Sequence, residues 1–73
     1  MRKHSVVITG HQTSLSLEDE FWEELRRIAI QQKISLTQLI ENIDNKRRTN
    51  LSSALRVYIL ETLKEEIINN KNT

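Results

Sequence analysis

The chain contains no cysteine, which excludes a disulfide framework and a thiolate metal site. It has a single glycine, Gly10, so no glycine-rich phosphate loop can form. The longest apolar runs, Val6–Ile8 and Val57–Leu60, are far too short to cross a bilayer. With 73 residues the chain holds one domain at most, of a size that is only marginally stable alone. We therefore predict a soluble, cytoplasmic, single-domain protein with no membrane partner.

The formal net charge is only +1, which argues against a strongly basic coat for nucleic acid. The distribution is more informative than the sum, because residues 1–17 carry no acid and residues 18–24 carry five. Carboxylates are favoured in the first turn of a helix by the helix dipole, so we interpret this acidic block as a solvated helix start. The basic turn 46–48 is open to two interpretations, as solvated loop charge or as a phosphate contact.

The segment GHQTSLSLE, residues 10–18, shows the period-2 alternation of a strand that is buried on one face. This pattern predicts a strand at about 11–17, with Leu15 and Leu17 facing inward. Gln12, Ser14 and Ser16 then form a small, polar outward face.

Such a strand needs a partner for its backbone N–H and C=O groups. One candidate is a hairpin in which SVVIT folds back across a Gly10-His11 turn. That hairpin would set Val7 opposite Ser14 and Ile8 opposite Thr13, mixing apolar with polar residues. Pairing with the same strand of a second chain keeps the faces separate, so we favour the interchain ribbon. Residues 1–9 are then a basic arm, and a second strand at Val6–Ile8 is left open.

Three helices are predicted after the strand, at about 18–32, 35–45 and 51–68. Ser16 and Asp19 have the spacing of a capping box for the first helix. Ser35 and Gln38 have the same spacing for the second, which also shows a single clean apolar stripe.

The third helix is apolar around most of its circumference, which indicates burial on more than one side. A chain this small cannot cover such a helix alone. We therefore expect it to enlarge a dimer core or to bind a cognate protein partner, and both a dimer and a tetramer fit the sequence. Residues 69–73 are predicted to be a frayed tail.

No constellation of residues supports catalysis, a metal or a cofactor. No serine has an evident base, and no carboxylate pair has an evident cleft. His11 has only His4 as a potential co-ligand, so a histidine at the rim of the core is the simpler interpretation. We predict that the protein is not an enzyme.

One strand followed by capped helices resembles the ribbon–helix–helix fold of the Arc and MetJ repressors. More narrowly, the chain resembles small bacterial ribbon–helix–helix proteins with the pattern Gly-His-x-Thr-Ser-x-Ser-Leu-Glu-x-x-Phe-Trp. The residues that carry this pattern are Gly10, His11, Thr13, Ser14, Ser16, Leu17, Glu18, Phe21 and Trp22. The resemblance covers about residues 5–62 and implies a mainly α fold: one N-terminal strand paired across a homodimer, two helices, and here an additional C-terminal helix, within a domain at 10–68.

The resemblance implies double-stranded DNA as the partner, with the ribbon in the major groove. Its base-reading positions map onto Gln12, Ser14 and Ser16. Its phosphate site maps onto the N-terminus of the second helix, at Ser35 and Leu36. Further phosphate contacts are predicted for Arg2, Lys3, Arg47 and Arg48. The strand departs from the family because it carries no arginine or lysine.

The predicted function is therefore a homodimeric DNA-binding protein, either a transcriptional repressor or the DNA-binding half of an antitoxin. The alternative is a dimer that has kept the fold as a protein-interaction module without specific DNA binding. The residues predicted to form the dimer core are Leu15, Leu17, Phe21, Trp22, Leu25, Leu39, Ile43, Leu55 and Tyr58.

Overall fold

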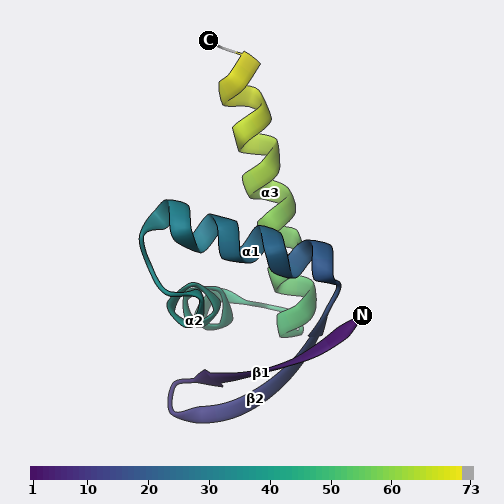
Figure 1. The fold of residues 1–73 in the computed structure, drawn as a ribbon, viewed down its shortest axis with the longest axis vertical. Helices are drawn as coiled ribbons and strands as arrows, with labels where there is room; N and C mark the ends of the chain where they lie inside the picture. Colours follow the sequence, from purple (N-terminus) through teal and green to yellow (C-terminus); the bar gives the residue numbers. More distant parts are fainter. Residues whose placement is uncertain (72–73) are drawn as a thin grey trace.

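The computed structural model describes residues 1–71, which form a two-stranded antiparallel hairpin followed by three helices (Figure 1). The strands are β1 (Arg2–Ile8) and β2 (His11–Leu17). The helices are α1 (Asp19–Gln32), α2 (Leu36–Lys46) and α3 (Leu51–Lys71). The hairpin lies at one end of the molecule, and α3 runs from beside it past α1 to the C-terminus.

The predicted strand is confirmed at His11–Leu17, but its partner is β1 of the same chain. The sequence analysis favoured a second chain as this partner, whereas the structure shows the hairpin alternative, and residues 2–8 form a strand where a basic arm was expected. The turn consists of Thr9 (φ 51°) and Gly10 (φ 78°). Positive φ at both central residues defines a type I′ turn, whose twist matches that of the flanking strands.

This turn lies one residue earlier than the Gly10-His11 turn considered from the sequence. Moving the turn by one residue moves the partner of each β1 residue by two positions along β2, so every side chain keeps its face and only its opposite neighbour changes. In the structure Val6 pairs with Thr13, and Val7 pairs with Gln12. Apolar and polar residues therefore do lie opposite each other, and the chain accommodates this because Val7 and Gln12 are both exposed while Val6 and Thr13 are both half-buried. The inner face consists of Arg2, His4, Val6 and Ile8 on β1 with His11, Thr13, Leu15 and Leu17 on β2.

The two helix starts differ in how they are capped. At α1 the N-cap is Glu18, with no side-chain capping bond, so the predicted Ser16–Asp19 capping box is wrong. Ser16 is still part of β2, which keeps its side chain on the sheet. At α2 the cap is confirmed, because Ser35 Oγ accepts a hydrogen bond from the Gln38 amide at 3.0 Å. The Gln38 side chain does not reach back to Ser35 and donates instead to Asn42.

Helix α3 is longer than the sequence predicted. It continues to Lys71, so residues 69–71 of the predicted frayed tail are helical, and residues 72–73 lie outside the described residues. No helix in the described part of the chain is long and apolar enough to span a membrane.

The core lies between the inner face of the hairpin and the three helices, all within one chain. Six of the nine residues predicted for a dimer core are buried here, and Phe21, Trp22 and Tyr58 are half-buried at its edge. The buried hydrophobic residues are Ile8, Leu15, Leu17, Leu25, Ile28, Ala29, Leu39, Ile40, Ile43, Leu55 and Ile59. The hairpin therefore contributes both strands of a ribbon that is fixed to its own helices.

Candidate nucleic-acid interface

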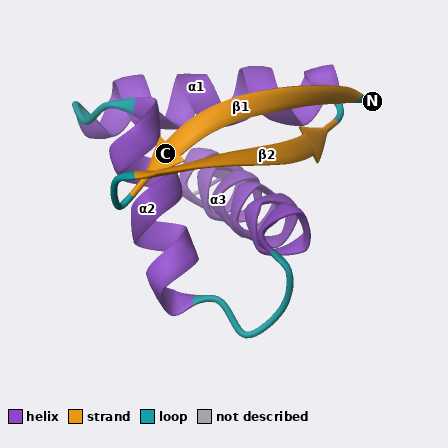
Figure 2. Cartoon of the chain, turned by 90° about the horizontal axis from the view of Figure 1, so that it is seen from below, coloured by secondary structure: helices purple, strands orange, loops and turns teal. Residues whose placement is uncertain are grey.

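The hairpin presents a face of small and polar side chains that points away from the helices. Figure 2 shows the two strands lying across the helical layer with their outer side uncovered. The outward pairs are Lys3 with Ser16, Ser5 with Ser14, and Val7 with Gln12. All of these except the half-buried Ser16 are exposed. We refer to this surface as the ribbon face.

The ribbon face matches the dimensions of a DNA groove. Paired strands lie about 4.7–4.9 Å apart, and the major groove, about 12 Å wide, admits a two-stranded ribbon. Its chemistry varies along its length. Gln12 can make two hydrogen bonds to an adenine edge, and the adjacent Val7, 55% exposed, can contact a thymine methyl group. Serines lie in the middle, and the cation Lys3 lies at the open end.

Ser16 is fixed in place by the helices. Its carbonyl oxygen accepts a hydrogen bond from Ser52 Oγ of α3 at 3.0 Å, and its residue is half-buried. Of the three predicted base-reading residues, Gln12 and Ser14 are therefore the accessible ones. The contact with Ser52 attaches the strand to α3 and orients the ribbon face relative to the helices.

The predicted phosphate-binding cations lie at both ends of the hairpin. At the open end Lys3 is free of ion pairs with residues 1–69, whereas Arg2 Nε lies 3.5 Å from Asp19 Oδ1 in an exposed pair. Arg47 shares a surface hollow with the turn, lined also by Thr9 and His11. It donates to Asp44 and to the Thr49 carbonyl, so its guanidinium holds the α2–α3 loop.

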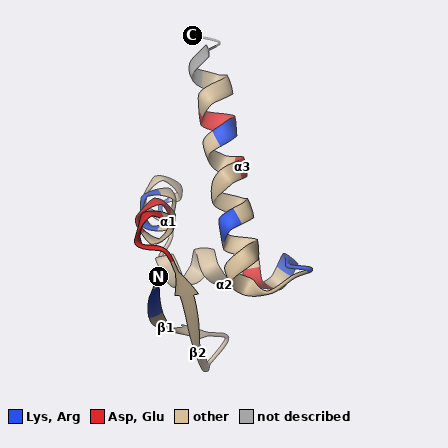
Figure 3. Ribbon diagram, turned by 90° about the vertical axis from the view of Figure 1, so that its right-hand side faces the viewer, with Lys and Arg blue, Asp and Glu red and all other residues tan. Residues whose placement is uncertain are grey.

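Arg48 is exposed in the α2–α3 loop. Figure 3 shows basic residues, in blue, in this loop beside the start of α3. At the N-terminus of α2, Ser35 is exposed and Leu36 is half-buried. The hollow that Arg47 shares with the hairpin turn lies at the opposite, C-terminal end of α2. The structure thus brings the turn of the hairpin to the C-terminal end of α2. Ser35 and Leu36 are not assembled with the ribbon face in this chain.

The acidic residues that follow the strands are held at the base of the hairpin. Glu18 accepts a hydrogen bond from Arg56 Nε of α3 at 3.0 Å. Backbone hydrogen bonding at Glu18 itself, followed by this bond from Arg56, lowers the pKa of the Glu18 carboxyl group from its ordinary value of 4.5. Figure 3 shows the acidic first turn of α1 beyond the end of β2, which itself carries no charged residue. The ribbon face is therefore free of acid.

A stacked pair that the sequence analysis missed attaches β1 to α1. The rings of His4 and Trp22 are 3.7 Å apart between centroids and 6° from parallel. His4 Nε2 is buried without a hydrogen-bond partner in the described part of the chain, which costs free energy. Trp22, which was predicted for the dimer core, is thus partly covered by its own chain.

The sequence analysis also missed the contribution of β1 to the ribbon face. Lys3 was expected as a phosphate contact outside the strand, and Ser5 and Val7 were given no role. A turn placed at Thr9-Gly10 would have revealed this contribution, because residues 3–8 then form a strand whose side chains at positions 3, 5 and 7 lie on the ribbon face. With β1 included, the ribbon carries the cation that β2 alone lacks.

The comparisons agree with this architecture. The model of the ribbon-helix-helix domain family matches residues 1–63, which include the hairpin, α1, α2 and residues 51–63 of α3. No curated protein and no solved structure is similar enough to the chain to be matched with it. The fold is generally that of DNA-binding regulators that dimerise, and such domains are typically not enzymes. A family match over more than four fifths of the residues, on a hairpin followed by helices, shows that this chain belongs to the ribbon-helix-helix domain family.

Proposed function

We propose that the protein is a homodimeric DNA-binding regulator, of the repressor or antitoxin type, that places the ribbon face of each hairpin in the major groove. The observation that carries this proposal is the composition of that face: exposed, free of acid, made of short side chains, and bearing Gln12 and Lys3 at opposite ends. Family membership supports the same function.

The turn end of the ribbon face would carry most of the sequence preference. Gln12 would read an adenine, and Val7 would contact the methyl group of a neighbouring thymine. Lys3 and Arg2 at the open end and Arg48 in the α2–α3 loop would contact phosphates, which position the ribbon without reading sequence. A homodimer would read two such half-sites as an inverted repeat.

Selection of duplexes from a random pool at physiological salt tests this proposal. The expected result is an enriched inverted repeat with an A·T pair at one position of each half-site. Gln12→Ala should relax the preference at that position at a cost of about 1–3 kcal/mol, while folding is retained. Circular dichroism checks the fold. Uniform binding of every duplex by the parent protein, or an unchanged preference in the variant, would show that the ribbon face is not the reader.

The salt dependence of affinity separates phosphate contacts from base contacts. Lys3→Gln should weaken binding to all duplexes and reduce the slope of log affinity against log salt by about 1. Arg26→Gln is the matched control, because Arg26 is an exposed cation on α1, away from the hairpin. Equal slopes for both variants would contradict a groove-bound hairpin.

The alternative function, a protein-interaction module, is favoured by one observation, the uncovered apolar surface of α3. Weak binding to all duplexes, with little dependence on salt, would support it over the DNA-binding function.

A further inference from the structure

Helix α3 has two apolar faces, and its own chain covers one of them. Leu55 and Ile59 are fully buried against the hairpin and the other helices, with Leu63 half-buried above them. The opposite face is exposed: Val57 (51%), Leu60 (51%), Ile67 (57%) and Ile68 (58%). Their spacing of three, seven and one residues places them on one side of the helix, together with the exposed Glu61 and Lys64. We name these six residues the outer stripe.

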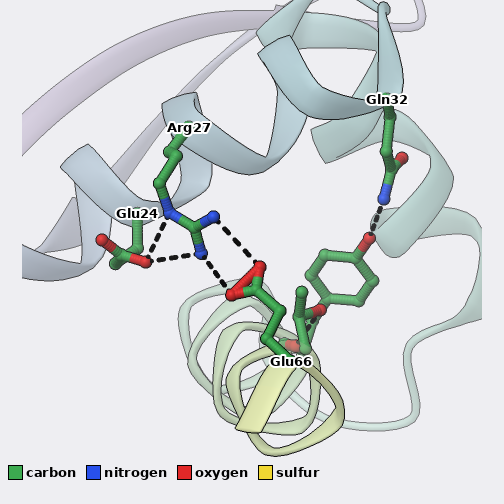
Figure 4. A network of polar contacts seen from close by, with 6 residues as sticks. Glu24, Arg27, Gln32 and Glu66 are labelled. Carbon is green, nitrogen blue, oxygen red and sulfur yellow. Dashed lines mark hydrogen bonds and ion pairs between the residues drawn. The ribbon is translucent and has the colours of Figure 1, made fainter. Parts of the chain in front are cut away.

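The far half of α3 extends beyond the body of the molecule, as both Figure 1 and Figure 3 show. It is held at a fixed angle by Arg27 of α1, which donates hydrogen bonds to both carboxylate oxygens of Glu66, each at 3.0 Å (Figure 4). A further bond joins Arg27 to Glu24 at 2.9 Å. Hydrogen bonding to Glu66, followed by hydrogen bonding to Glu24, raises the pKa of Arg27.

Glu66 lies on the opposite side of α3 from the outer stripe, because it is two residues, or about 200°, away from Ile68 and Lys64. The Arg27 clamp therefore keeps the stripe directed outward. The family match ends at residue 63, so Lys64, Ile67 and Ile68 lie in a segment that the family domain does not include. A rigid helix with an apolar outer surface is an unusual feature for a monomer of this size.

We propose that the outer stripe binds the outer stripe of a second copy of the chain, with the two α3 helices antiparallel. This inference rests on the proposed homodimer, for which it names the surface, but not on DNA binding by the ribbon face.

The order of charges along the stripe favours a second copy in antiparallel orientation. Apolar pairs form its two ends, and Glu61 and Lys64 lie between them. A twofold axis midway between Glu61 and Lys64 places Val57 of each copy opposite Ile68 of the other. The same axis places Glu61 of each copy opposite Lys64 of the other, so the surface is complementary to itself.

The parallel orientation lacks this complementarity, because it sets Glu61 beside Glu61 and Lys64 beside Lys64. Among residues 1–69, whose side chains the structure describes, neither side chain takes part in an ion pair, so both are available to a partner. The interface spans about three helical turns, or roughly 16 Å, which predicts a dimer of moderate affinity that dissociates on dilution.

Sedimentation equilibrium of the full chain over a wide range of concentration tests the surface. The parent should be a reversible dimer, and Leu60→Glu should weaken the dimer by at least about tenfold. Ile30→Glu is the matched control, because Ile30 is an exposed isoleucine (74%) on α1 outside the stripe, and it should leave the dimer unchanged. Circular dichroism should be the same for all three proteins, since both substituted side chains are exposed.

A charge exchange tests the antiparallel arrangement. Glu61→Lys and Lys64→Glu should each weaken the dimer, because each puts like charges opposite one another. The double variant should restore it, and an equimolar mixture of the two single variants should form a mixed dimer. A double variant no better than the single variants would overturn the arrangement.

The outcomes separate this inference from the proposed function. A parent dimer that Leu60→Glu leaves intact overturns the stripe as the surface, whereas the homodimer stands. A parent that is monomeric at every concentration overturns both the stripe and the homodimer. Gln12-dependent base preference is measured separately, and its loss would overturn groove reading while the stripe stands.

Discussion

The hairpin and α3 differ in how far their own chain covers them. Each is an element that cannot be stable alone: a strand needs hydrogen-bond partners, and a helix that is apolar all round needs cover on two sides. The hairpin meets its need within the chain, because β1 pairs with β2 and the inner face packs on the helices. Helix α3 does not, because its outer stripe stays exposed.

This difference changes the physical reason for expecting a dimer. From the sequence, the dimer was favoured because it gave the strand a partner that kept its faces separate, and in the structure β1 supplies a partner within the chain. The remaining reason is α3, whose inner face is anchored through Leu55 and Ile59 while Val57 and Leu60 face outward. The reason for expecting a dimer therefore moves from the hairpin to the exposed outer stripe of α3.

The largest expected effect comes from placing the same carboxylate in each region. Leu15→Glu buries a charge at a residue that is 4% exposed in the inner face of the hairpin. The loss of a buried leucine alone costs about 2–5 kcal/mol, and a chain of this size is stable by only about 5–10 kcal/mol. We expect Leu15→Glu to be unfolded by circular dichroism and heat denaturation.

Leu60→Glu, the same change on the outer stripe, should retain its helical spectrum and much of its thermal stability. The comparison breaks if both variants unfold, since α3 would then be buried on two sides in the monomer. It also breaks if Leu15→Glu stays folded, which would mean that the inner face of the hairpin is not part of the core.

The turn of the hairpin gives a smaller effect. Gly10→Ala should cost about 1–2 kcal/mol, because an alanine at a φ of +78° is strained. A Cβ at Gly10 would meet nothing within 4 Å, so steric clash does not contribute. The expected readout is a lower Tm, by about 4–8 °C for each kcal/mol. Asn45→Ala, an exposed substitution within α2, serves as the control. A Tm equal to that of the control would mean that the turn does not have this geometry.

Much of the fold could be predicted from local patterns. The period-2 alternation located β2, apolar stripes located α1 and α2, and the Ser35 cap fixed where α2 begins. The position of the turn was not predicted, because Thr9 is β-branched and rarely adopts a positive φ. The position of the turn sets the register, and so decides which residue of β1 lies opposite each residue of β2.

The candidate site was predicted only in part, for the same reason. Gln12 and Ser14 follow from the alternation within β2, whereas Lys3, Ser5 and Val7 depend on the register between two strands. Contacts between distant residues, such as Ser52 with Ser16 and His4 with Trp22, have no signature at fixed spacing. The two faces of α3 were visible in the sequence, but which of them the chain covers depends on how α3 packs on the rest of the molecule.

The smallest expected effect concerns the ion pair that joins the end of the hairpin to α3. Because the pKa of Glu18 is lowered in the folded state, its contribution to stability is present above the ordinary value of 4.5 and is lost as the pH falls through the folded-state pKa. Glu18→Gln should therefore be less stable than the parent near pH 6, and the two Tm values should converge as the pH falls through the lowered pKa of Glu18. Glu20→Gln is the matched control, since Glu20 is exposed in the same helical turn and takes part in no ion pair with the side chains of residues 1–69. If the parent and Glu18→Gln differ by the same amount at every pH, the charge of Glu18 does not link the hairpin to α3, and Ser52 is left as the hydrogen-bonding contact between these two regions.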